Sequence, residues 1–78
     1  MDFEYPVIDK KKLGSTLKRY MQERRLTARD VQEYLGLACV QTVYRWTAGI
    51  SIPTVDNLYA LSRLINISID ALVGSKSN

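Results

Sequence analysis

Residues that begin or end helices recur at short intervals along this chain of 78 residues. Asp, Ser and Thr side chains accept hydrogen bonds from the free amides at a helix start, whereas Gly and Pro favour a helix end. The candidate starts are Asp9, Thr27, Thr54 and Ser68, and the candidate ends are Gly36, Gly49 and Pro53. These residues leave room only for short helices, which we expect at about residues 9–25, 28–35, 39–48, 54–65 and 68–73.

Apolar residues within these segments recur every three or four positions, which is the spacing of one helix face. They are Leu13, Leu17, Tyr20, Met21, Val31, Leu35, Val43, Trp46, Leu58, Leu61, Leu64, Ile65, Ile69, Leu72 and Val73. A chain of this length forms one domain and buries roughly 60–65% of its unfolded surface. The sequence therefore predicts a compact all-α domain of five helices over residues 9–74, with residues 1–8 as an N-terminal arm or short strand and 75–78 as a flexible tail.

The composition excludes several kinds of chemistry. The chain has one cysteine, Cys39, and no histidine, so we expect neither an internal disulfide nor the usual zinc and acid–base sites. It has no Gly-rich phosphate loop and no nucleophile with a candidate base, so the sequence predicts no enzyme, no metal and no cofactor. No apolar run is long enough to span a membrane, and acidic residues precede the apolar ones at the N-terminus, the reverse of a secretion signal. A cytoplasmic protein is expected.

Positive charge is concentrated in the first third of the chain. Eight basic residues and one acidic residue lie between positions 10 and 29, so this segment carries +7 whereas the remainder carries −4. Such asymmetry favours a polyanionic partner, with nucleic acid as the first candidate and acidic lipid as the second; the alternative is a solvated helix face. The basic residues are Lys10, Lys11, Lys12, Lys18, Arg19, Arg24, Arg25 and Arg29.

The segment LACVQTVYRWTAG, residues 37–49, has two chemically different sides when it is drawn as a helix. Val40, Val43, Trp46 and Thr47 fall on one side, and Gln41, Tyr44, Arg45 and Ala48 fall on the other. A short helix, a glycine-containing turn and this third helix match a helix-turn-helix, whose second helix enters the DNA major groove. An amphipathic surface helix is the alternative. The outward side lacks Lys and Glu, which favours contact, with Gln41, Tyr44 and Arg45 as base readers.

The chain also resembles a known family. GSTLKRYMQERR, LTARDVQEYLG, VYRWTAG and IPTVDNLYALSRLINISIDAL together resemble the XRE-type, lambda-repressor-like and Cro-like helix-turn-helix family over about residues 13–73. The resemblance implies a sequence-specific, repressor-like regulator that binds double-stranded DNA, with base readers at Val40, Gln41 and Arg45. It also implies phosphate contacts at Thr27 to Arg29 and in the segment after the third helix, where Ser51 and Thr54 lie.

Four features depart from the family pattern. Gln32 stands where a small alanine is common, and the segment LGLACVQTVYRW is one residue longer than usual. Met21 and Thr47 replace an arginine and an acid that often form a salt bridge, so neither charge is left without its partner. Ala28 replaces a glutamine at the start of the second helix, where Arg29 is the candidate substitute for its phosphate contact.

The partners follow from these interpretations. Lys10, Lys11 and Lys12 are candidates for gripping phosphate, because positive charge at a helix start is otherwise unfavourable. We expect two copies, a homodimer on a pseudo-palindromic site, since a single module buries only about 600–1,000 Å² on DNA. The alternative function is an antitoxin or adaptor, a protein-binding domain of the same fold, in which Phe3, Tyr5 and Val7 join a partner's sheet.

Overall fold

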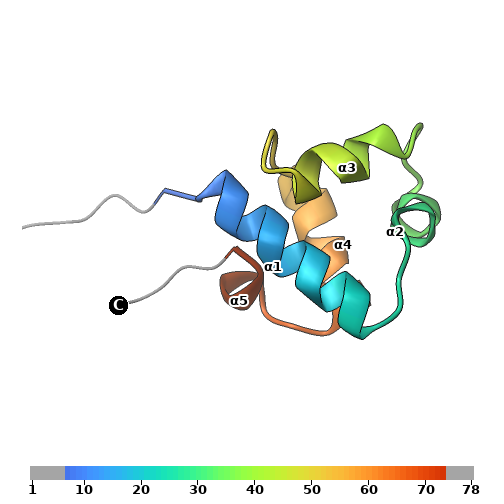
Figure 1. Ribbon diagram of the computed structural model, residues 1–78. Coiled ribbons are helices and arrows are strands. Elements are labelled where there is room, and N and C mark those ends of the chain that lie inside the picture. The colour runs from blue at the N-terminus through green and yellow to red at the C-terminus, as the bar shows by residue number, and fades with distance from the viewer. Residues whose placement is uncertain (1–6, 74–78) are drawn as a thin grey trace, which may run out of the picture.

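The structure, a computed structural model, describes residues 7–73 (Figure 1). Within that range the chain forms helices and no strand, which confirms the predicted all-α fold. The helices are α1 (Lys10–Glu23), α2 (Ala28–Leu35), α3 (Gln41–Thr47), α4 (Val55–Ile65) and α5 (Ile69–Val73). Val7 and Ile8 belong to no regular element, and the rest of the predicted arm or strand, like the tail at 75–78, lies outside the described residues.

The predicted caps are present at the helix starts. The carboxylate of Asp9 accepts a hydrogen bond of 3.0 Å from the Lys11 amide at the start of α1. Thr54 Oγ1 accepts from the Asn57 amide at 3.3 Å, and Ser68 Oγ caps α5 in the same way. Each of these bonds satisfies an amide that has no acceptor inside its own helix, which explains why the helices begin at these residues.

Four of the helices are followed by a residue in the left-handed conformation. After α3, the Gly49 amide donates to the carbonyl of Trp46 at 3.1 Å, and the Ile50 amide donates to that of Arg45 at 2.9 Å, which together form a Schellman motif. Gly36 and Gly49 were expected to end helices in this conformation, and both do. The first helix was expected to end near Arg25, but α1 ends two residues earlier, at Glu23. The left-handed residues are Arg25, Gly36, Gly49 and Asn66, with φ values of 57°, 69°, 76° and 58°.

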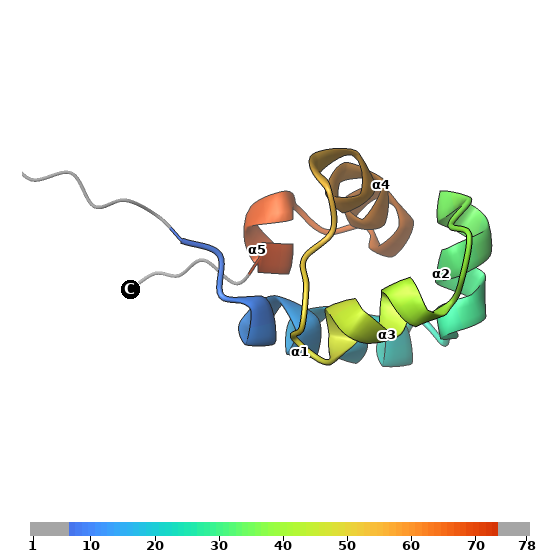
Figure 2. The same ribbon diagram turned by 90° about the horizontal axis from the view of Figure 1, so that it is seen from above.

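The core is formed by one face of every helix. α1 packs against α3 and α5, and α2 packs against α3 and α4, so α3 is held from two sides (Figure 2). The predicted apolar positions at Leu35, Leu64, Ile69 and Val73 are only partly buried and lie at the edge of the core. The buried apolar residues are Leu13, Leu17, Met21, Val31, Val43, Trp46, Leu58, Leu61, Ile65 and Leu72.

α1 approaches α3 closely at Gly14, a buried glycine in the second turn of α1. A Cβ atom at this position would lie 2.4 Å from the carbonyl oxygen of Trp46 and 2.9 Å from that of Thr47. Both neighbours are backbone atoms, which cannot move aside as a flexible side chain can. The missing side chain therefore lets the backbone of α1 touch the last turn of α3.

We expect Gly14→Ala to lower the free energy of unfolding by about 1–3 kcal/mol, because the new methyl group overpacks this contact. At an exposed helix position the same substitution would stabilise the protein by about 1 kcal/mol, so the sign of the change is diagnostic. Urea unfolding followed by circular dichroism measures it. Ser15→Ala, at the exposed neighbouring position, is the control and should change stability by less than about 0.5 kcal/mol. A Gly14→Ala variant as stable as the wild type would contradict the contact.

Candidate nucleic-acid interface

α3 separates its side chains into a buried and an exposed side. Val43 is completely buried and Trp46 is 3% exposed, and both belong to the core cluster. Gln41, Tyr44 and Arg45 are exposed on the other side. The two sides predicted from the spacing of residues 40–48 are therefore present. The reading roles assigned to the exposed residues stay predictions.

The start of α3 corrects the sequence-based boundary. The helix was expected from about residue 39, but Cys39 and Val40 precede it, and the first helical residue is Gln41. Val40 has helical backbone angles, and its carbonyl accepts from the Val43 amide at 3.0 Å and the Tyr44 amide at 3.3 Å. Its side chain is half-buried, at the N-terminal end of the helix. The observed start of α3 lies two residues after the predicted one because Cys39 and Val40 belong to the longer turn between α2 and α3.

Gln32 connects α2 to this turn. Its Nε2 donates a hydrogen bond of 3.2 Å to the carbonyl of Leu37, one residue beyond the left-handed Gly36. The Leu37 amide in turn donates to the Gln32 carbonyl at 3.0 Å. A small residue at position 32 has no donor that reaches the turn. The Gln32 side chain does reach it, and its hydrogen bond to the Leu37 carbonyl makes the larger side chain compatible with the longer turn.

We expect Gln32→Ala to lower the free energy of unfolding by about 1 kcal/mol, because a half-buried carbonyl loses its donor. Gln32→Glu keeps the size but presents a carboxylate, which cannot donate, and should be no more stable than the alanine variant. Thermal unfolding monitored by circular dichroism compares them, with Glu33→Ala on the exposed side of α2 as the control. Wild-type stability in both Gln32 variants would show that the bond contributes nothing.

The start of α2 forms a capping box. The Asp30 amide donates to Thr27 Oγ1 at 3.0 Å, and the Thr27 amide donates to the Asp30 carboxylate at 2.9 Å. The hydrogen bonds from the Thr27 backbone, and then from its side chain, lower the pKa of the exposed Asp30 carboxyl. The amides of Ala28 and Arg29 precede the first intrahelical bond and remain available to an outside acceptor. The Arg29 side chain is exposed beside them.

The segment after α3 packs against the start of α1. A Cβ atom on Gly49 would lie 2.9 Å from Lys11 Cγ and 3.0 Å from Lys11 Cα, so the two backbones are in contact (Figure 2). The exposed residues Lys10 to Lys12 therefore lie next to the C-terminal end of α3. Ser51 in this segment is half-buried, and Thr54 is exposed with its hydroxyl oxygen engaged in capping α4. The structure thus places Lys11 against Gly49, at the beginning of the segment that holds Ser51 and leads to Thr54 at the start of α4.

The basic residues between positions 10 and 29 are all exposed. Within residues 7–73 the single ion pair joins Arg24 to Glu23 at 3.7 Å, so the other cations of this segment are not neutralised by a described carboxylate. Arg19 and Arg24 lie over the ring of Tyr20, at 4.9 Å and 5.0 Å from its centroid. Most of the segment's positive charge is therefore available to an anionic partner.

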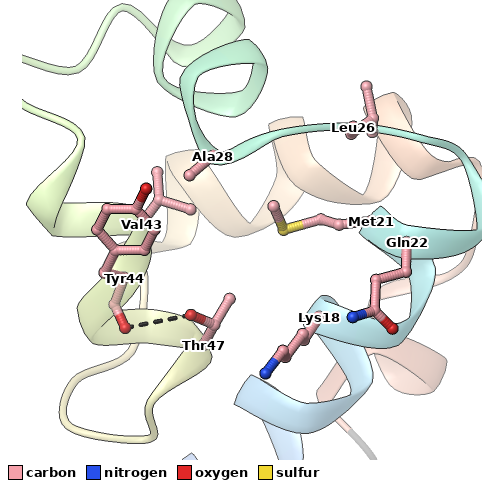
Figure 3. Close-up of a pocket in the computed structure, with 8 residues that line it drawn as sticks. All are labelled: Lys18, Met21, Gln22, Leu26, Ala28, Val43, Tyr44 and Thr47. Carbon is pink, nitrogen blue, oxygen red and sulfur yellow. Dashed lines mark hydrogen bonds between the residues drawn. The ribbon is translucent and has the colours of Figure 1, made fainter.

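A cavity of about 310 Å³ opens between α1, the start of α2 and α3 (Figure 3). Met21 and Thr47, the two residues that replace the charged pair of the resembling family, both line it. Thr47 Oγ1 turns back to donate to the Tyr44 carbonyl at 3.2 Å. Neither side chain carries a charge, so the space between them holds no charge that needs a partner. The lining residues are Lys18, Met21, Gln22, Leu26, Ala28, Val43, Tyr44 and Thr47.

Two polar residues that line the cavity, Lys18 and Gln22, were not assigned to a site by the sequence analysis. Lys18 contributed only to the count of basic residues, and Gln22 was given no role. Both side chains extend from α1 toward the cavity, on the side opposite Tyr44 (Figure 3). Their spacing of four residues places them on one face of α1, but the sequence carries no signal that α3 lies beside that face.

The described residues contain no other arrangement with an evident chemical function. No group of three or more His, Cys, Asp or Glu side chains in residues 7–73 is placed to hold a metal ion. Cys39 is exposed in the turn, and its Sγ lies 3.6 Å from Thr42 Oγ1, a contact that lowers the pKa of the thiol. Among these residues no helix is both long and apolar enough to cross a membrane.

The comparison with known proteins agrees with this geometry. A family model described as helix-turn-helix matches residues 17–72, a range that holds all of α2, α3 and α4, the second half of α1 and most of α5. No curated protein and no solved structure matches the chain.

Proposed function

We propose, because this chain belongs to the XRE-type helix-turn-helix family of DNA-binding regulators, that it is a sequence-specific, repressor-like transcription regulator that reads the major groove with α3. The observation that carries the proposal is the division of α3, with Trp46 and Val43 buried beneath Gln41, Tyr44 and Arg45. A helix that reads DNA must be held firmly from behind while polar side chains reach the base edges in front. Double-stranded DNA as the partner agrees with the cytoplasmic location expected from the sequence.

The exposed side of α3 has suitable chemistry for direct readout. A glutamine pairs with adenine N6 and N7, and an arginine pairs with guanine O6 and N7, each worth about 1–3 kcal/mol of discrimination. We assign these roles to Gln41 and Arg45. Tyr44 lies between them in the sequence and adds a hydroxyl group. Val40 precedes them, and its methyl groups suit the methyl group of thymine.

Two groups of residues support the proposed phosphate contacts. The start of α2 offers the free amides of Ala28 and Arg29, beside the hydroxyl of Thr27 and the Arg29 guanidinium. The second group is Lys10 to Lys12, which lie beside Gly49 at the C-terminal end of α3, with Ser51 and Thr54 in the segment that leads from there to α4. Ala28 lines the same cavity as Val43 and Tyr44 and therefore lies beside the middle of α3. Contacts at both places would fix the helix in the groove.

A selection of random duplexes against the purified protein tests the proposal by yielding a preferred sequence. On that sequence, Arg45→Ala and Gln41→Ala should each relax preference at a different base pair and lose about 1–3 kcal/mol. Arg29→Ala should weaken binding to all sequences alike and reduce the salt dependence by about one phosphate contact. Arg24→Ala, which removes an arginine already paired with Glu23, is the matched control and should change affinity least.

Two results would contradict the proposal. Equal losses on selected and random duplexes for both α3 variants would contradict the reading roles. Specific DNA binding weakens steeply as salt rises, with log affinity falling by about 0.9 per phosphate neutralised for each unit of log salt concentration. A duplex affinity that does not respond to salt would contradict DNA as the partner and favour the protein-binding alternative.

We further propose that two copies bind one pseudo-palindromic site, with half-sites about one helical turn apart. Sedimentation of the protein with the selected duplex should then give a mass of two chains per duplex. Moving the half-sites apart by about five base pairs places them on opposite faces of the DNA and should abolish cooperative binding. A single chain on the duplex at saturating protein concentration would overturn this part of the proposal.

A further inference from the structure

The outer side of α4 is exposed, and no helix within residues 7–73 packs against it. Leu58, Leu61 and Ile65 are buried on the inner side, where α4 packs against α2 and α5. At about 100° per residue the exposed positions fall within an arc of about 100° on the opposite side. We call them the α4 stripe, and they are Val55, Asp56, Tyr59 and Arg63.

The α4 stripe exposes large apolar side chains. Val55 is 80% exposed and Tyr59 is 55% exposed. The segment leading into the helix adds Ile50 and Ile52, at 61% and 42%. Exposed apolar side chains are normal when scattered, but a run of them on one helix and its approach indicates an interaction surface.

The charges on the α4 stripe are arranged symmetrically about its tyrosine. Asp56 lies three residues before Tyr59, and Arg63 lies four residues after it. The Arg63 guanidinium lies over the Tyr59 ring, 5.9 Å from its centroid, and donates to the ring hydroxyl at 3.4 Å. Asp56 forms no ion pair with any residue in the range 7–73. One acid and one base therefore flank a central aromatic side chain on the same side of the helix.

This arrangement is complementary to itself in one orientation. When two α4 helices run antiparallel about a two-fold axis near Tyr59, Asp56 of each copy meets Arg63 of the other, and the two Tyr59 rings meet at the axis. A parallel pair would instead place Asp56 against Asp56. We infer that the α4 stripe is a self-association surface, on which a second copy of this chain docks with its α4 antiparallel.

The contact area indicates a weak and concentration-dependent dimer. α4 has only 11 residues, and two such helices bury less than the roughly 1,200–2,000 Å² of a stable complex. The inference uses the α4 stripe with Ile50 and Ile52 and none of the residues assigned to DNA, so it stands independently of the proposed function.

Sedimentation of the full chain over a range of concentrations tests the inference with two charge-reversed variants. Asp56→Arg leaves two bases on the α4 stripe and Arg63→Asp leaves two acids, so each should self-associate more than about tenfold more weakly than the wild type. An equimolar mixture of the two variants should form heterodimers, because each stripe now complements the other. The double variant, with both charges exchanged, should regain homodimers. Glu33→Arg on the exposed side of α2 is the control and should associate as the wild type does.

Circular dichroism first establishes that each variant is folded. Wild-type protein that stays monomeric at about 1 mM would overturn the inference. So would undiminished association of either single variant, or a mixture of folded variants that forms no heterodimer. Duplex binding by the same proteins separates the two proposals. A dimer with no affinity for DNA would refute the proposed function alone, whereas a DNA-binding protein with no α4 dimer would refute only this inference.

Discussion

The contact between α1 and α3 at Gly14 is the constraint on which the rest of the structure depends. α3 has seven residues, and a helix of that length is not stable in water without tertiary contacts. Its conformation is supported by the Trp46 indole in the core, by the Schellman motif at Gly49 and by the backbone of α1 beneath its last turn. The exposed side of α3 presents a defined set of side chains because its other side is held so closely.

The departures from the family pattern are connected through the structure. Gln32 bonds to the longer turn, so a residue that would crowd two helices elsewhere stabilises their connection here. The uncharged pair Met21 and Thr47 lines a cavity beside α3, and the Thr47 hydroxyl finds its acceptor within its own helix. In both places the substitution looks unfavourable alone, but the polar group of the new side chain has a hydrogen-bond acceptor nearby. A small core tolerates variation in this way.

Much of the fold could be predicted because its signals are local. The capping box of Thr27 and Asp30 joins groups three residues apart, and the left-handed Gly36 and Gly49 follow from the missing Cβ. Arg25 and Asn66 adopt the same conformation, but their side chains do not require it, so their left-handed backbone was not predicted. The contact of Gly14 and the bond of Gln32 depend on how helices meet, which helical spacing does not encode.

In the candidate site, too, the features with local sequence signals could be predicted, and those that depend on packing could not. The exposed side of α3 follows from periodicity and was predicted correctly, whereas the start of the helix depends on the turn and was placed too early. The position of Lys10 to Lys12 beside the end of α3 depends on the packing of Gly49 against Lys11, a contact between residues far apart in sequence. Which side chain meets which base is decided by the DNA as well as the protein, and the chain alone cannot encode it.

The cavity beside Tyr44 bears on how the exposed side of α3 tolerates substitution. In a tightly packed interior, a side chain that changes rotamer must displace its neighbours, and that displacement is penalised. Tyr44 borders about 310 Å³ of open space instead, so its ring can be replaced by a side chain of different size or direction while the core remains intact. With the base-reading role proposed for Tyr44, recognition and folding would be uncoupled at this position, and natural selection would be free to revise the one without endangering the other.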